Sequence, residues 1–495
     1  LIYTGGLMVV TLNIILSIIT FVFVLNVVLA AAVVFFERRS PSSTWAWIFV
    51  LFFVPVIGFF VYLIFGRNTG RQKAFGPKAE KDRQTLFNYV KNHDELSLEV
   101  EKQLFSNDGI KLERTYRHML DFATLNINSG SWLTYNNKMT RYIDGNDKFE
   151  ALIEDIKNAE KFIHMEYYIF RPDNLGKRIV YELAKKASQG VEVRLMYDFM
   201  GNILNPKQFF KPIREAGGSV VAFTPPFFIR LNYRNHRKIA VIDGKVGYVG
   251  GFNIGDEYLG KVKRFGNWRD THARFEGDIV DQLQIRFMMD WNFCSEDKFC
   301  VNDFYYPEKH VKNRLPAQIV CSGPDTQWRN VKNSYFKMIN EAEKNIYIET
   351  PYFAPDDGIL EALKVAALSG IDVRIIIPAN PDHFFVYWAS ISYLGELLEA
   401  GVKCYQYQNG FIHSKTVFVD GIAATIGTAN MDIRSFGLNF EVNSFIFDED
   451  TTKFLENDFL NDLNQCDEIT YDWYQKRGKL FKFREAVSRL ISPML

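Results

Sequence analysis

The chain has 495 residues, too many for one ordinary hydrophobic core, so we expect more than one globular lobe. Its 58 basic and 58 acidic residues give a formal net charge of zero, which excludes a general attraction to nucleic acid. Aromatic residues make up 15% of the chain, a content typical of proteins that meet lipid, and the five cysteines lack metal-ligand spacing.

Two uncharged apolar stretches lie near the start of the chain, at about residues 8–36 and 45–65. Each is long enough for a helix that crosses a bilayer core of about 30 Å, so we predict two transmembrane helices within residues 1–66. The basic residues that follow the second stretch before any acidic one are Arg67, Arg71, Lys73 and Lys78. The positive-inside rule then predicts a multi-pass cell-membrane protein whose catalytic region faces the cytoplasm.

A charged, mostly helical linker is predicted for residues 67–130, and an internal repeat follows it. Residues 163–173 align with 346–356, and Gly190–Arg194 aligns with Gly370–Arg374. Each copy alternates helices with apolar strands and ends in a motif strand, which predicts an α/β fold with a mainly parallel sheet in each half. We place the lobes at residues 131–312 and 313–470, related by a pseudo-twofold axis so that both motif strands face one cleft.

The last segment, residues 471–495, mixes cations with aromatic side chains. Basic amphipathic segments of this kind often lie on anionic membrane surfaces, and we predict such a role here. A solvated terminal helix that packs on the second lobe is the alternative.

The motif strands carry the residues of chemical interest. The first copy contains His236, Lys238, Asp243 and Asn253, and the second contains His413, Lys415, Asp420 and Asn430. A histidine and a lysine two residues apart on an extended run project from the same face. A neutral imidazole beside an ammonium group can attack and hold a phosphoryl group, and two copies supply a nucleophile and a separate proton donor. The duplicated motif therefore predicts covalent displacement at phosphorus.

The paired motifs resemble those of the phospholipase D superfamily, and the whole chain resembles the bacterial cardiolipin synthases within it. The similarity extends to residues 37–47, between the two apolar stretches, and to residues 488–493 near the C-terminus. The resemblance implies two phospholipase D-like lobes, a phosphohistidine at His236, and a proton donor for the departing glycerol at His413. The residues alone leave the order of the two histidines open.

The phosphate oxygens are assigned to side chains from both copies, namely Lys238, Asn253, Lys415, Thr428 and Asn430. The first copy has Gly251 where the second has Thr428, so we expect one hydroxyl contact to be missing on that side. The two lysines already supply the positive charge that a metal would bring, and we predict neither a metal nor another cofactor.

Four carboxylates complete the predicted site. Asp243 and Asp420 belong to the catalytic motif of the family, and the resemblance implies that they hold loops rather than touch phosphate. A histidine nucleophile also needs an acceptor at its second ring nitrogen, which fixes its tautomer. Asp270 and Glu441 match the family positions for this orienting carboxylate.

The predicted substrate is a phosphodiester with acyl chains, because the apolar residues 223–229 lead into the first motif and the apolar residues 383–388 lie in the second lobe. We predict a phosphatidyltransferase that converts two molecules of phosphatidylglycerol into cardiolipin and glycerol. Its partners would be anionic phospholipids in a membrane, without nucleic acid.

Three alternatives remain open. A hydrolytic phospholipase D would use water in place of the second alcohol. A membrane-tethered nuclease would use the same chemistry, but the neutral charge and the lack of a long basic stripe argue against it. A non-enzymatic lipid-binding scaffold would not require both motifs to be intact.

Overall fold

The computed structural model describes residues 2–36, 41–54, 58, 62, 68–91, 114–127, 129–206, 208–224 and 232–492. It divides into two compact units, Leu1–Pro77 with Pro225–Tyr233, and Lys78–Thr224 with Arg234–Leu495. The first unit contains the apolar helices α1 (Ile2–Phe36) and α2 (Pro41–Phe53). Among the described residues, no helix is both long and apolar enough to cross a membrane. The predicted second span, about 45–65, extends into residues outside this description.

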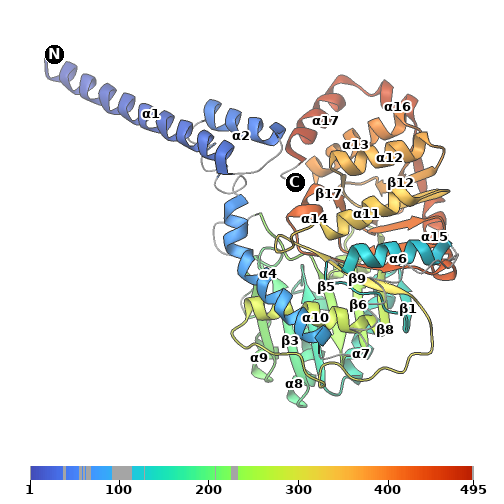
Figure 1. Ribbon diagram of the computed structural model, residues 1–495. Helices are drawn as coiled ribbons and strands as arrows, with labels where there is room; N and C mark the ends of the chain where they lie inside the picture. The colour runs from blue at the N-terminus through green and yellow to red at the C-terminus, as the bar shows by residue number, and fades with distance from the viewer. Residues whose placement is uncertain are drawn as a thin grey trace. The chain divides into compact units, whose positions relative to one another are not determined.

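The second unit, here called the two-sheet unit, contains one mixed sheet in each lobe (Figure 1). The first sheet has the order β1-β8-β6-β5-β2-β3-β4. Its strands are β1 (Asn137–Tyr142), β2 (Phe162–Tyr167), β3 (Glu192–Asp198), β4 (Ser219–Phe223), β5 (Lys238–Ile242), β6 (Val246–Gly250) and β8 (His272–Gly277). Helices α7 (Gly145–Asn158), α8 (Asn174–Ser188) and α9 (Lys211–Glu215) pack against it, as does α10 (Ile279–Cys294).

The second sheet has the order β19-β13-β12-β10-β15-β16-β18-β9. Its strands are β9 (Ala317–Ser322), β10 (Asn345–Glu349), β12 (Asp372–Pro378), β13 (Lys403–Tyr407), β15 (Thr416–Val419), β16 (Ala423–Gly427), β18 (Glu441–Ile446) and β19 (Cys466–Ile469). The helices of this lobe are α11 (Asn330–Glu341), α12 (Asp357–Leu368), α13 (Phe384–Glu399), α14 (Ile433–Gly437), α15 (Glu449–Leu463), α16 (Tyr471–Lys476) and α17 (Lys479–Ile491). Helices α4 (Asn68–Lys91) and α6 (Arg114–Ile127) precede both sheets in the chain.

The prediction of mainly parallel sheets is wrong. In the first sheet β2, β3 and β4 run parallel to one another, and the other neighbouring strands are antiparallel. The second sheet repeats this arrangement, with β10, β12 and β13 as the parallel strands. The physical reason is a tight turn after each motif strand, where Asp243 (φ 54°) and Gly244 (φ 65°) adopt left-handed conformations and reverse the chain. A hairpin therefore follows each motif strand, and the returning strand pairs with it in an antiparallel manner.

The two lobes exchange short strands beside the motifs. Strand β14 (Phe411–Ile412), just before His413, pairs in parallel with β7 (Trp268–Arg269) of the first lobe. On the other side Asn235, just before His236, forms an isolated bridge with Phe440 of the second lobe. This reciprocal pairing is the relation that a twofold arrangement of the lobes produces, and it brings the two motifs to one interface.

Candidate active site

Each motif histidine is positioned by a backbone contact with the opposite lobe. The N–H of His236 donates to the carbonyl oxygen of Phe440 (3.0 Å), and the N–H of His413 donates to that of Arg269 (2.7 Å). The next residues along the partner strands are Glu441 and Asp270, the two predicted orienting carboxylates. The exchanged strands therefore set each imidazole beside a carboxylate.

The imidazole–carboxylate pairs cross between the lobes. Nδ1 of His236 lies 3.0 Å from a carboxylate oxygen of Glu441, and Nδ1 of His413 lies 2.6 Å from one of Asp270. All four side chains are buried. An Nδ1–H that donates to the carboxylate leaves Nε2 as the basic nitrogen of the ring. Each half-site therefore takes its histidine from one lobe and its carboxylate from the other.

The charges at these pairs follow from burial and from the neighbouring lysines. Burial lowers the pKa of His413 to about 4, and burial also lowers the pKa of His236, although the carboxylates oppose this change. Burial raises the pKa of Asp270 and Glu441, but the nearby histidine and lysine charges outweigh it, and both values lie below the ordinary range. At neutral pH the site thus contains neutral imidazoles and ionised carboxylates, as a nitrogen nucleophile requires.

The two motif lysines lie directly beside the histidines. Nζ of Lys238 donates to the carbonyl oxygen of His236 (2.6 Å), and Nζ of Lys415 donates to that of His413. Burial lowers the pKa of Lys238 to about 7 and that of Lys415 to about 8, against the attraction of the nearby carboxylates. A bound anionic phosphodiester would raise both pKa values again, because an opposite charge favours the ammonium form.

The motif aspartates lie at the far ends of the motif strands. Their carboxylates accept backbone N–H groups at 2.7–3.0 Å, from Glu160, Lys161 and Phe162 for Asp243, and from Glu343, Lys344 and Asn345 for Asp420. Both aspartates adopt positive φ angles, 54° and 56°. These contacts tie the motif turn to the start of the central strand in each lobe and involve neither histidine.

The two motif asparagines are buried but have different partners. Oδ1 of Asn253 accepts the backbone N–H of Ile169 (3.1 Å), whereas Oδ1 of Asn430 has no hydrogen-bond partner within the described part of the chain. A buried polar atom without a partner is costly, so Asn430 is the more available of the two for a ligand.

Thr428 and Gly251 occupy equivalent places in the repeat, and each lies directly beside one of the two predicted orienting carboxylates. The hydroxyl of Thr428 donates to Glu441 (2.5 Å), a contact that the sequence did not predict. A Cβ atom added to Gly251 would lie 1.9 Å from Oδ1 of Asp270, so only glycine leaves room for that carboxylate. The glycine in the first copy therefore makes room for Asp270, and the missing hydroxyl contact to phosphate on that side stays a prediction.

Sequence reasoning gave no role to a second pair of acids, Glu166 and Glu349. The side-chain amide of Asn235 donates to Glu166, and the hydroxyl of Thr416 donates to Glu349 (3.0 Å). Burial raises the pKa of Glu166 to about 8. The two acids occupy equivalent positions in the internal repeat, and this equivalence could have identified them as candidate site residues.

Aromatic rings also pack on the two imidazoles and were not predicted. Tyr168 contacts the His236 ring with centroids 4.9 Å apart, and Trp268 contacts the His413 ring at 5.2 Å. Such contacts limit the orientations available to each imidazole.

A buried ionic cluster lies behind the first half-site. Within the described ranges the carboxylates of Asp82, Asp290 and Asp325 are close enough to hold a metal ion, but Nζ of Lys78 lies 2.5–2.9 Å from all three. Asp290 in turn pairs with Arg237, the residue after His236. Lys78 is therefore an internal cation, and its use as a membrane-flanking charge in the topology prediction was wrong, because the side chain is 2% exposed.

Comparisons with known proteins identify the family of this chain. A family model described as "Cardiolipin synthase, PLD-like domain" matches residues 152–291 and 335–463, and one described as "Phospholipase_D-nuclease N-terminal" matches residues 15–67. The cardiolipin synthase of Listeria monocytogenes serotype 4a is 49% identical over 477 residues, which is 95% of this chain and 98% of the relative. That of Staphylococcus aureus strain Mu50 is 47% identical over 489 residues, 98% of each chain.

Among solved structures, the phosphatidylserine synthase of Haemophilus influenzae matches with a TM-score of 0.59 and 15% identity, over 77% of this chain and 100% of that one. At this identity the likeness shows the fold alone. With two phospholipase D-like lobes and relatives that match nearly end to end, the chain belongs to the phospholipase D-like cardiolipin synthase family.

Proposed function

We propose that the protein is a cardiolipin synthase, a phosphatidyltransferase that converts two molecules of phosphatidylglycerol into cardiolipin and glycerol. The observation that carries this proposal is the pair of buried histidines, each with Nδ1 on a carboxylate of the other lobe and a lysine at its backbone carbonyl. The names of the relatives support the choice of substrate.

In the first half-reaction Nε2 of one histidine attacks the phosphorus of phosphatidylglycerol. A P–N bond forms and the P–O bond to the head-group glycerol breaks. The other histidine, neutral in the free site, takes up a proton when the anionic phosphodiester binds and gives it to the departing oxygen. By family resemblance His236 is the nucleophile and His413 the acid. Lys238, Lys415 and Asn430 would hold the non-bridging oxygens as charge develops on them.

In the second half-reaction the terminal glycerol hydroxyl of another phosphatidylglycerol loses its proton to the acid–base histidine. Its oxygen attacks phosphorus, the P–N bond breaks, and cardiolipin leaves with both histidines restored. Over the complete cycle one phosphodiester bond is exchanged for another, so the cycle needs no nucleotide.

The first unit is proposed to anchor the enzyme in the cell membrane through two transmembrane helices, with the two-sheet unit in the cytoplasm. The support is the uncharged sequence of residues 8–36 and 45–65, and the match of residues 15–67 to an N-terminal family model. Exposed side chains on α1 and α2, such as Phe21 (68%) and Phe53 (70%), also require an apolar environment.

Incubation of the purified full chain with phosphatidylglycerol alone tests the proposal. We expect cardiolipin and free glycerol in equal amounts, with phosphatidic acid as a minor product. Predominant phosphatidic acid would instead identify a hydrolytic phospholipase D. Cleavage of single-stranded DNA at a comparable rate would identify a nuclease.

A further inference from the structure

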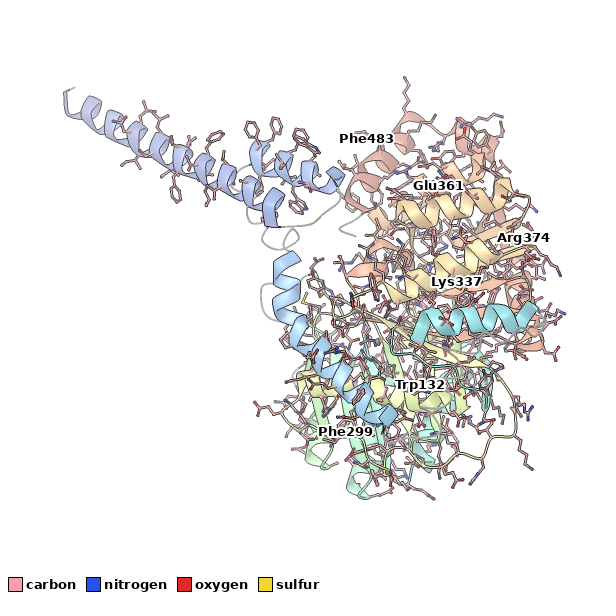
Figure 2. All side chains as sticks on the ribbon, in the orientation of Figure 1. Trp132, Phe299, Lys337, Glu361, Arg374 and Phe483 are labelled. Atoms are coloured by element: carbon pink, nitrogen blue, oxygen red, sulfur yellow. The ribbon has the colours of Figure 1, made fainter. Side chains whose placement is uncertain are left out.

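Helix α17 (Lys479–Ile491) turns four of its apolar side chains away from the protein. Leu480, Phe483, Val487 and Leu490 recur at intervals of three and four residues, so they share one face of the helix. Their exposed fractions are 59%, 65%, 37% and 82%. Figure 2 labels Phe483, and we call these four residues the outer stripe.

The inner face of the same helix is polar. Glu485 is buried and accepts two hydrogen bonds from Arg477 (2.6 and 2.7 Å). Directly after the helix, the hydroxyl of Ser492 lies 3.0 Å from that of Tyr393 on α13. Ser488 is buried as well. A surface helix ordinarily buries its apolar face and exposes its polar one. The reversed orientation of α17 therefore leaves an apolar surface that needs a partner.

Cations border the outer stripe on both sides. At 100° per residue Lys479 and Lys482 lie along one edge of the stripe and Arg484 lies along the other. Lys479 and Lys482 are exposed and have no ion-pair partner within the described ranges, whereas Glu485, the acid of this helix, is paired internally with Arg477. The surface is therefore apolar at its centre and positive at its edges.

The apolar surface continues from α17 onto the start of α13. Phe481 packs on Trp388 (5.1 Å between centroids), and Trp388 packs on Phe384, which is 50% exposed beside the exposed Phe385. We call the outer stripe together with Phe384 and Phe385 the docking face.

The α13 end of the docking face lies close to the second half-site. Asp382, two residues before Phe384, is near enough for its charge to raise the pKa of Lys415. The same loop and Phe411, which packs near the His413 ring (6.1 Å), line one small cavity.

We propose that the docking face inserts into the surface layer of an anionic phospholipid bilayer and holds the second half-site there. An apolar stripe with basic edges matches acyl chains below negatively charged head groups. A second copy of the same face would not provide this match, because its edges carry the same positive charge. This contact goes beyond the proposed reaction, because it concerns how the two-sheet unit meets the membrane and not what the histidines do.

Photocrosslinking in the full chain tests the contact without using activity. A benzophenone amino acid replaces Phe483 (65% exposed) or, as the matched control, Tyr181 (63% exposed) on α8. Figure 1 shows α8 and α17 at opposite ends of the two-sheet unit. In vesicles of phosphatidylglycerol and phosphatidylcholine we expect a lipid adduct at position 483 and none at 181. A crosslink to a second copy at 483, equal lipid adducts at both positions, or no lipid adduct would overturn the proposal.

A charge reversal tests the basic edge. With the crosslinker at 483, K479E/K482E should lower the adduct yield on phosphatidylglycerol vesicles by about thirtyfold or more, because two surface lysines contribute on the order of 1 kcal/mol each at an anionic bilayer. The control K177E/K185E reverses two exposed lysines on α8 and should leave the yield unchanged. Equal yields in the two variants would mean that anionic lipid is not the partner.

Discussion

Nδ1 of His236 lies 3.0 Å from the carboxylate of Glu441, although 205 positions of sequence separate the two residues. The equivalent contact in the other copy joins His413 to Asp270, which are 143 positions apart in the sequence. Each lobe supplies the carboxylate that contacts the histidine of the other. The chemistry of either half-site therefore depends on the same interface.

The first prediction concerns these carboxylates. Glu441→Gln and Asp270→Asn should each lower the rate of cardiolipin formation by about 10²–10⁴-fold, because an amide can favour the wrong imidazole tautomer without changing the shape of the site. Initial rates on phosphatidylglycerol measure the effect. Glu361→Gln on the surface of α12 is the control and should keep the wild-type rate. A wild-type rate in Glu441→Gln would contradict an orienting role for this residue.

The second prediction concerns the histidines. His236→Ala, His413→Ala and the double variant should lose activity to the same extent, because the two groups serve one cycle and their effects do not add. When a reaction with radiolabelled phosphatidylglycerol is quenched during turnover, an acid-labile label should remain on the peptide that contains His236. A label on the His413 peptide would reverse the proposed order of nucleophile and acid.

The third prediction compares Gly251 with Thr428. In Gly251→Ala the new Cβ would lie 1.9 Å from Asp270, so the carboxylate must move, and a displacement of this size can cost about 10²-fold in rate. Thr428→Ala removes one hydrogen bond to Glu441 and should cost about tenfold. Assays under matched conditions rank the two variants. A larger loss in Thr428→Ala would favour a direct phosphate contact for its hydroxyl.

The fourth prediction concerns pH. Lys238, with a pKa of about 7, and Lys415, with a pKa of about 8, must be protonated to hold an anionic phosphodiester. Raising the pH removes these protons from the free enzyme, so kcat/KM should fall as the pH rises through 7 to 8. A water-soluble short-chain phosphatidylglycerol separates this effect from lipid packing. In Lys238→Arg the fall should begin at higher pH, because the guanidinium stays charged. An unchanged profile in that variant would exclude Lys238 as the titrating group.

The fifth prediction concerns the buried ionic cluster. Lys78→Met leaves Asp82, Asp290 and Asp325 without their central cation and should lower the free energy of unfolding by about 3–5 kcal/mol. Urea unfolding in detergent measures the change. Lys81→Met, at an exposed position in the same helix, should change stability by less than about 0.5 kcal/mol. Equal stabilities would show that the cluster tolerates the loss of Lys78.

The internal repeat and its two motifs could be recognised from the sequence, because a duplicated pattern is visible without a structure. The sequence identified the two motifs, and the comparisons confirm the family. It did not predict that Glu441 and Asp270 cross between the lobes, since linear spacing does not reveal which lobe a side chain faces. The parallel sheet was a wrong inference from helix–strand alternation, because the hairpin turn at Asp243 reverses the chain. The apolar residues of α17 were noted only by composition, and their outward orientation depends on which face packs on α13.

The exchanged carboxylates also decide when the enzyme becomes competent during its synthesis. The ribosome completes His236 and the rest of the first sheet long before it reaches Glu441, 205 positions later. Until then the first imidazole lacks the acceptor that sets its tautomer, and Asp270 has no histidine to hold. A nascent chain that is already in contact with lipid should therefore be inactive, and turnover should begin only when the second lobe has folded onto the first.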